Sequence, residues 1–277
     1  MTNKPENKLE LLEQDIAKLF HQGPKKADIW DITWSSIKSL FSFAILFSLF
    51  FIIINFSAYS QKIKYFVEIK IFGKEISSEN QQAFTILEPI ANEKQYSNII
   101  TSGIPGNENL DAYLRKNIQD NHLIIPKISV NAPITWESPV NRILDDLKNG
   151  VSHYGGTALP GERGNIFITG HSSNFWWDPG KFKQVFVLLD KLTEGDRIYL
   201  SYENQPYVYK VITKKIVKPT QIEVLDPTDQ SIISLMTCTP VGTTINRLIV
   251  QAVQIYPPTI KKNSTRSVLP DSLPAVR

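Results

Sequence analysis

The chain has 277 residues, of which 42% are hydrophobic and 21% charged, as is typical of a protein with a packed core. Its 30 basic and 27 acidic residues leave a formal net charge of +3, and no basic stripe interleaved with aromatic residues is present, which argues against a nucleic-acid partner. A single cysteine excludes an intramolecular disulfide, and the four scattered histidines lack metal-ligand spacing, so no cofactor is predicted.

The first 38 residues are mostly polar and contain one short amphipathic pattern. Its apolar residues have helical spacing and stop before Gly23-Pro24; they are Leu9, Leu12, Ile16, Leu19 and Phe20. We predict a small helix within a cytoplasmic segment that comprises residues 1–38.

Residues 39–61 contain no charged side chain, and their centre, Leu40–Phe56, is almost wholly apolar. As a helix this stretch would be about 34 Å long, enough to cross the hydrocarbon core of a bilayer. A buried core helix would need apolar partners on every side, and a cleaved signal peptide would not follow so long a polar segment. We therefore predict a single transmembrane signal anchor. Lysines flank both of its ends, so the positive-inside rule does not decide its orientation.

Residues 62–108 mix alternating apolar positions with polar loops and end at Gly103-Ile-Pro-Gly106. We predict a stalk or a covering segment here.

Signals for regular structure become dense over residues 109–256. Helices are predicted around Leu110–Ile118, from Ser138-Pro139 to Gly150, and through Phe182–Leu189. Runs of β-branched and aromatic residues predict strands at Leu123–Val130, Ala132–Ile134, Asn165–Thr169, Arg197–Tyr202, Tyr207–Val217, Ile232–Thr237 and Arg247–Tyr256.

Many short strands with few short helices favour a mainly-β barrel or sandwich. Regular crossover helices are lacking in the pattern, which argues against a parallel α/β fold. Residues 257–277 are rich in Pro, Ser and Lys and are predicted to form a disordered tail.

Three strand ends carry reactive side chains. These stretches are Ile168-Thr-Gly-His171, Ser234-Leu-Met-Thr-Cys238 and Asn246-Arg247-Leu-Ile-Val250. A strand end at a barrel rim is a place where a rigid scaffold can present a side chain to substrate. The loop between Cys238 and Arg247 is long enough for a hairpin-like return that would bring these two residues together.

The chemistry of such a trio is coherent. A thiol with a pKa of about 8.5 needs help to act as a nucleophile at neutral pH, and a neighbouring guanidinium stabilises both the thiolate and an oxyanion. A histidine can protonate a leaving amine and deprotonate an incoming one. Each residue also has a structural alternative: Cys238 as a buried small apolar residue, His171 as a structural histidine, Arg247 as a surface charge.

The ordered set resembles the sortase family over roughly Ile124–Tyr256. Ile125–Ile134 is similar to the opening strand pair of the family, and Pro160–His171 to the stretch before its histidine. Ser234-Leu-Met-Thr-Cys238 is similar to the family's Thr-Leu-x-Thr-Cys pattern, with serine in the first position. Thr239-Pro-Val-Gly-Thr243 followed by Arg247-Leu-Ile-Val250 resembles its last loop and strand.

The resemblance implies a mainly-β, sortase-like eight-stranded barrel with a few short helices, preceded by the single transmembrane helix. It implies that Cys238 attacks the Thr–Gly-type bond of a C-terminal sorting signal on a secreted protein. The thioester would be resolved by an amine of a cell-wall peptide or a pilin, with His171 as acid/base and Arg247 stabilising oxyanion or substrate. The catalytic domain would then lie outside the cytoplasmic membrane; dependence on calcium stays open.

Further candidates surround the trio. The resemblance assigns Thr237 a substrate contact, and His153 is a candidate for lining the substrate groove, with a structural role as the alternative. Trp176 and its neighbour Trp177 are candidates for a substrate wall, with packing as the alternative. The Asp-Pro-aromatic lid motif that pilin-polymerising members can carry is not found in residues 62–123, which disfavours that subclass.

Rival functions remain at this point. A cell-wall L,D-transpeptidase would place its arginine two residues after the cysteine, and here the gap is nine. A plain cysteine hydrolase and a membrane-tethered, non-catalytic β-domain for binding or scaffolding are the alternatives. Leu269-Pro-Asp-Ser-Leu273 superficially resembles a sorting signal but lacks the Thr-Gly step, and we interpret it as a coincidence.

Overall fold

The computed structural model describes residues 16, 29–71, 114–175, 177–258 and 273–275. The chain forms two compact units, residues 1–51 and 52–277. The predicted helix at Leu9–Phe20 and the predicted stalk beyond Ile71 lie outside the described residues, apart from Ile16.

Helix α2 spans Ile29–Ile54, and within it Thr33–Ile54 is long and apolar enough to cross a membrane. Its large apolar side chains are exposed, as expected for a helix whose environment is lipid. The helix fits a membrane anchor, but it begins before the predicted boundary at residue 39. Lys38 lies inside the helix, where its ammonium is over the Trp34 ring, 5.6 Å from the centroid.

The helix breaks at Asn55, and α3 then spans Phe56–Phe66, followed by a π-helical turn at Val67–Ile71. The methyl group of Ala58 is buried in the core of the barrel, and Lys62 Nζ lies 3.3 Å from Asp190 Oδ2. Residues 56–61, which the sequence prediction included in the transmembrane span, therefore lie in a helix that packs against the barrel.

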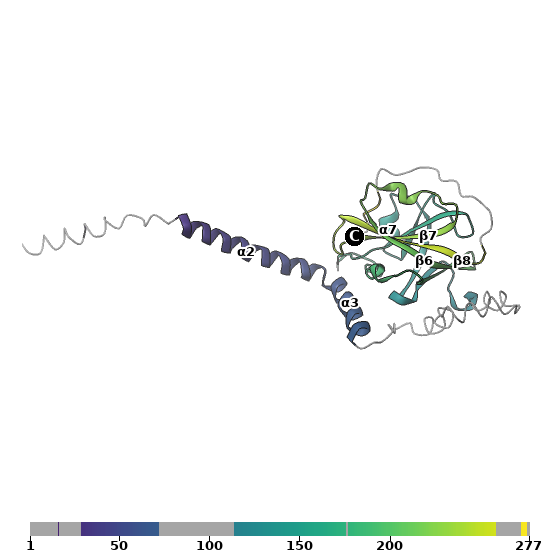
Figure 1. Cartoon of the computed structure of the whole chain (residues 1–277), viewed down its shortest axis with the longest axis horizontal. Coiled ribbons are helices and arrows are strands. Elements are labelled where there is room, and N and C mark those ends of the chain that lie inside the picture. The colour runs from purple at the N-terminus through teal and green to yellow at the C-terminus, as the bar shows by residue number, and fades with distance from the viewer. Residues whose placement is uncertain (1–15, 17–28, 72–113, 176, 259–272, 276–277) are drawn as a thin grey trace, which may run out of the picture. The chain divides into compact units, whose positions relative to one another are not determined.

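Eight strands close into a barrel in the order β1-β2-β3-β4-β7-β8-β6-β5, and this confirms the predicted fold class. Figure 1 shows β6, β7 and β8 side by side. The pairs β2–β3 and β4–β7 are parallel and the others antiparallel. The strands are β1 His122–Ile125, β2 Val130–Ser138, β3 Val151–Tyr154, β4 Gly164–Thr169, β5 Arg197–Tyr202, β6 Gln205–Val217, β7 Ser231–Thr239 and β8 Asn246–Tyr256.

The helical segments between the strands are short. They are α7 Ile143–Asp146 and the 3-10 turns η2 Pro126–Ile128, η3 Leu189–Lys191 and η4 Ile222–Leu225, with one helical turn at residues 114–117. The predicted strand Leu123–Val130 is interrupted by η2, because Pro126 starts a turn and Ser129 has φ 54°.

The predicted helix through Phe182–Leu189 is wrong. The backbone there forms turns, and only Leu189–Lys191 is helical, as a 3-10 turn. Tertiary contacts override the helical spacing: the Phe186 N–H donates to the His171 carbonyl at 2.9 Å, and its ring packs closely over Gly170. Because that N–H is engaged outside the segment, it cannot serve a helix.

Alternation along the strands divides the apolar residues into two layers. On β7, Ile233 and Leu235 point into the barrel, whereas Met236 and Cys238 point outward. The outward-facing residues form an outer cluster, which consists of Ile143, Leu147, Tyr154, Phe167, Val217, Val224, Leu225, Met236, Cys238, Ile249 and Leu273. Cys238 therefore lies outside the barrel wall, in a layer covered by α7 and η4.

The barrel interior is expected to supply much of the stability. Ile198 is fully buried in β5, whereas Ile216 in β6 is 63% exposed. Ile198→Ala should lower the free energy of unfolding by about 2–5 kcal/mol, because it removes buried methyl groups and leaves a cavity. The matched control Ile216→Ala should change it by less than about 1 kcal/mol. Urea denaturation of the detergent-solubilised chain measures both; equal effects would contradict this core.

Candidate active site

The parallel ladder between β4 and β7 sets the position of His171. Each residue of β4 pairs with the residue 67 positions later, from Gly164 with Ser231 to Thr169 with Met236. The chain continues for two residues in the same direction, since the Gly170 N–H donates to the Met236 carbonyl at 3.1 Å. The same register brings His171 opposite Cys238.

The antiparallel ladder between β7 and β8 sets the position of the arginine, because Cys238 pairs directly with Arg247. Neighbouring strands lie about 4.8 Å apart, and residues directly opposite each other point to the same face. Extended by two residues beyond Thr169, the β4–β7 register aligns His171 with Cys238 and Arg247 in one row at the ends of β4, β7 and β8. We call these three candidate residues the catalytic row.

Residues beside the row hold His171 in place. Thr237 Oγ1 donates to the Gly170 carbonyl at 2.8 Å, and both groups are buried. A Cβ on Gly170 would lie 2.6 Å from a ring carbon of Phe186, so this position requires glycine. The structure places Thr237 next to Cys238 as predicted, but its hydroxyl is engaged within the protein rather than exposed to substrate.

The loop between β7 and β8 is tied to the segment that follows His171. The Gly242 N–H donates to Ser173 Oγ at 3.0 Å, and Gly242 has φ +84°, a conformation that favours glycine. The loop also closes on itself through a bond from the Thr243 N–H to the Pro240 carbonyl. Sequence reasoning missed Ser173; its position two residues after the histidine was the available signal.

Arg247 is 2% exposed, and its guanidinium donates hydrogen bonds to four backbone carbonyls. Two belong to its own loop: Thr244 O at 2.9 Å and Asn246 O at 3.2 Å, both from Nη1. The other two belong to residues far along the chain: Leu273 O at 3.3 Å from Nη2 and Pro274 O at 2.8 Å from Nε. The side chain thus binds peptide carbonyls beside the thiol.

Cys238 is 1% exposed, and Leu273 lies in the same outer cluster at 2% exposed. Leu273 belongs to the predicted disordered tail, yet residues 273–275 are described and lie against the barrel. The leucine side chain packs in the apolar outer cluster. Its N–H donates to the Pro219 carbonyl, and its carbonyl accepts from Arg247. Composition alone cannot detect such a short docked segment.

His153 lies in β3 and is fully buried, so it does not line a solvent-accessible groove in this structure. Burial lowers its pKa from 6.5 to about 4, partly opposed by a hydrogen bond to Ala158 O. Its Nδ1 accepts from the Glu137 N–H at 3.2 Å and its Nε2–H donates to Ala158 O at 3.0 Å. The ring is therefore neutral, and the nearby Glu137 carboxylate makes no ion pair with it. In this structure the ring is packed in the interior and bonded only to groups of the protein itself.

Trp176 lies outside the described residues. Its neighbour Trp177 is 53% exposed and stacks on Phe175, with ring centroids 4.4 Å apart. The stacked pair follows His171 in the chain by only a few residues, which keeps Trp177 a candidate for contact with a bound peptide.

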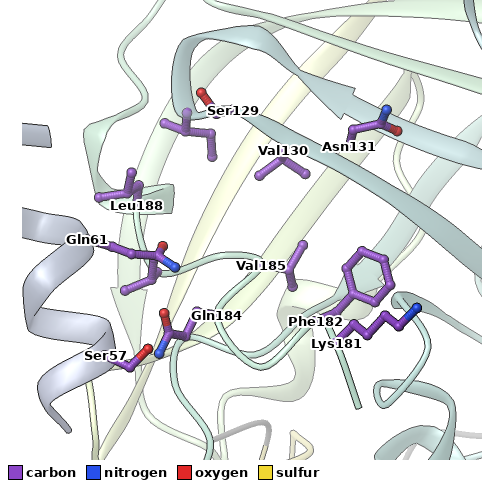
Figure 2. Close-up of a pocket in the computed structure, with 12 residues that line it drawn as sticks. Ser57, Gln61, Ser129, Val130, Asn131, Lys181, Phe182, Gln184, Val185 and Leu188 are labelled. Carbon is purple, nitrogen blue, oxygen red and sulfur yellow. The ribbon is translucent and has the colours of Figure 1, made fainter. Parts of the chain in front are cut away.

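Two cavities lie beside α3, and neither is lined by the catalytic row. The larger has a volume of 410 Å³ and is lined by Ser57 and Gln61 of α3, Ser129 and Asn131 near β2, and the 181–188 segment. Figure 2 shows these side chains around it. Cys238 opens onto neither cavity; Leu273 packs in its cluster instead. Within the described ranges, no group of three or more His, Cys, Asp or Glu is placed to hold a metal ion.

Comparisons with known proteins identify one domain of the chain. The family model for the Sortase domain matches residues 123–255. Sortase D of Bacillus subtilis (strain 168) is 30% identical over 138 residues, which cover 48% of this chain and 62% of that protein. Among solved structures, sortase C-1 from Actinomyces oris is 30% identical, covers 48% of this chain and 72% of that one, and has a TM-score of 0.42. A Clostridium perfringens Sortase D5 transpeptidase is 27% identical; the match covers 62% of this chain and 99% of that one, with a TM-score of 0.41.

The matched residues 123–255 contain six of the eight strands in full, most of β1 and β8, and all three members of the catalytic row. The chain belongs to the sortase family. It spans 62% of the length of the curated relative.

The buried neutral His153 predicts a pH dependence of stability. Its pKa is about 4 in the folded protein and 6.5 for an ordinary solvated histidine, so between these limits the unfolded chain binds the extra proton. Stability is therefore lost as the pH falls from about 6.5 toward 4, by up to about 3 kcal/mol. Urea unfolding at pH 7 and 4.5 should show a smaller difference for His153→Gln than for wild type. An unchanged difference would contradict the assignment.

Proposed function

We propose that the chain is a membrane-anchored cysteine transpeptidase that transfers an acyl group through a thioester on Cys238. The observation that carries this proposal is the catalytic row: a thiol on β7, a guanidinium opposite it on β8, and an imidazole two residues after β4, where the β4–β7 register extends to the thiol. The membership of the chain in the sortase family supports the same reaction class.

In the first step the Cys238 thiolate attacks the carbonyl carbon of the scissile amide, forming a C–S bond and moving an electron pair onto the oxygen. Arg247 stabilises the thiolate before the attack and donates to the oxyanion or to a neighbouring substrate carbonyl. His171 protonates the leaving amine as the C–N bond breaks, which leaves a thioester.

In the second step an amine attacks the thioester carbonyl. His171 accepts the proton from the incoming amine, and the C–S bond breaks to return the thiolate. The bonds from Arg247 to the Leu273 and Pro274 carbonyls support its role, because a substrate peptide offers the same acceptors.

The proposed substrates are secreted proteins with a C-terminal sorting signal that contains a Thr–Gly-type bond. The proposed acceptor is an amine of a cell-wall peptide or of a pilin subunit. α2 would anchor the chain in the cytoplasmic membrane, with residues before it in the cytoplasm and the barrel outside, where these substrates are found.

Incubation of the detergent-solubilised chain with a library of sorting-signal peptides tests the proposal. With an amine such as triglycine present, wild type should form an amide-linked product that mass spectrometry detects, and Cys238→Ala should form none. Formation of only the free carboxylic acid, at every amine concentration, would indicate a plain hydrolase. No cleavage of any peptide by either form would favour the non-catalytic β-domain.

Arg247→Lys should lower the rate of acyl transfer by about 10²–10³-fold, because an ammonium cannot reproduce the fixed fork of donors. The matched control is Arg163→Lys: Arg163 donates from Nε to the Asp229 carbonyl at 2.8 Å, away from the catalytic row. It should leave the rate within about twofold of wild type. Steady-state rates with one cleaved peptide measure both changes.

A further inference from the structure

The segment Leu273–Ala275 is docked beside the catalytic row. The Leu273 side chain packs in the outer cluster that contains Cys238, and only 2% of the residue is exposed. Its N–H donates to the Pro219 carbonyl at 2.7 Å, just after β6. We call these three residues the docked segment.

The guanidinium of Arg247 anchors the same segment from the other side. It donates to two successive peptide carbonyls, Leu273 O at 3.3 Å and Pro274 O at 2.8 Å. These donors are the ones that the proposed reaction needs for a substrate peptide or an oxyanion. While the docked segment holds them, a second peptide cannot use them.

We propose that the docked segment is an intramolecular occupant of the substrate cleft that shields Cys238 and has to leave before a peptide can bind; this inference rests on the proposed function. The segment places one apolar side chain in the buried cluster that contains the thiol, and it occupies two donors of the arginine. The chain thus carries its own competitor for the site.

The sequence of the segment allows it to bind without being consumed. Leu273-Pro-Ala is followed by Val276-Arg277, so residues 273–277 contain no Thr-Gly step of the kind proposed for substrates.

Among the described residues, the segment is held by one apolar side chain and three hydrogen bonds, a set of contacts that a competing peptide can replace. A segment on the same chain has a local concentration on the order of 1 mM. With an intrinsic dissociation constant on the order of 0.1 mM, it would occupy the cleft about ten times as often as it leaves it free. A substrate would therefore have to outcompete a roughly tenfold excess of the closed form.

The reactivity of the thiol tests the proposal independently of catalysis. Alkylation of Cys238 by iodoacetamide is followed by intact mass in the full detergent-solubilised chain. Leu273→Ser should react about tenfold faster than wild type, because the side chain that fills the cluster is shortened. The matched control Ala275→Ser, at an exposed residue outside the cluster, should react like wild type.

A synthetic peptide of residues 269–277, added at millimolar concentration to Leu273→Ser, should restore the slow reaction. Such restoration requires a folded cleft, so it also excludes unfolding as the cause of faster alkylation. Equal rates in all three proteins would overturn the proposal. Protection of wild type that grows with protein concentration would also overturn it, because the segment would then come from a second copy.

The two proposals fail in different ways. Suppose that Cys238 is alkylated faster in Leu273→Ser and that the 269–277 peptide slows this reaction, but no sorting-signal peptide is ever transferred. The proposed occupancy then stands and the transpeptidase function fails. If peptides are transferred at equal rates by wild type and Leu273→Ser, and alkylation is unchanged, the function stands and the occupancy fails.

Discussion

The parallel ladder between β4 and β7 is the constraint on which the site depends. Its register pairs residues 67 positions apart over the whole of β4, so that the histidine after β4 meets the cysteine near the end of β7. A shift of one residue would turn one of the two side chains to the opposite face of the sheet. The antiparallel β7–β8 ladder then adds Arg247 to the same row. The backbone pairing of three strands thus sets the positions of the three residues.

A buried cation shapes the surroundings of the row. Taking a guanidinium out of water is costly unless its donors find acceptors. In this protein the acceptors are four carbonyls, from Thr244, Asn246, Leu273 and Pro274. The first pair organises the loop before β8, and the second pair recruits the docked segment. The need of the buried guanidinium for acceptors accounts for its bonds to the Leu273 and Pro274 carbonyls, far along the chain.

Much of the fold could be predicted from the sequence, because strands β5, β6, β7 and β8 are long and rich in β-branched and aromatic residues. The pattern missed β3, whose four residues Val151–Tyr154 are all buried and show no alternation. It overestimated helix at Phe182–Leu189, where contacts with Gly170 and His171 dominate. The trio itself was predicted from its motifs, but the register that aligns it is a tertiary property. His153 and Leu273 show the same limit. Both are buried, and their burial could not be predicted from the residues next to them in the sequence.

The central claim is that Cys238 forms a covalent acyl intermediate. Intact-mass analysis of the detergent-solubilised chain, quenched in acid soon after mixing with a cleaved sorting-signal peptide, tests it most directly. The account predicts a mass increase equal to the acyl part of the peptide, mapped by proteolysis to Cys238 and removed by hydroxylamine. Peptide cleavage or transfer without any adduct on Cys238, or with an adduct on another residue, would contradict it.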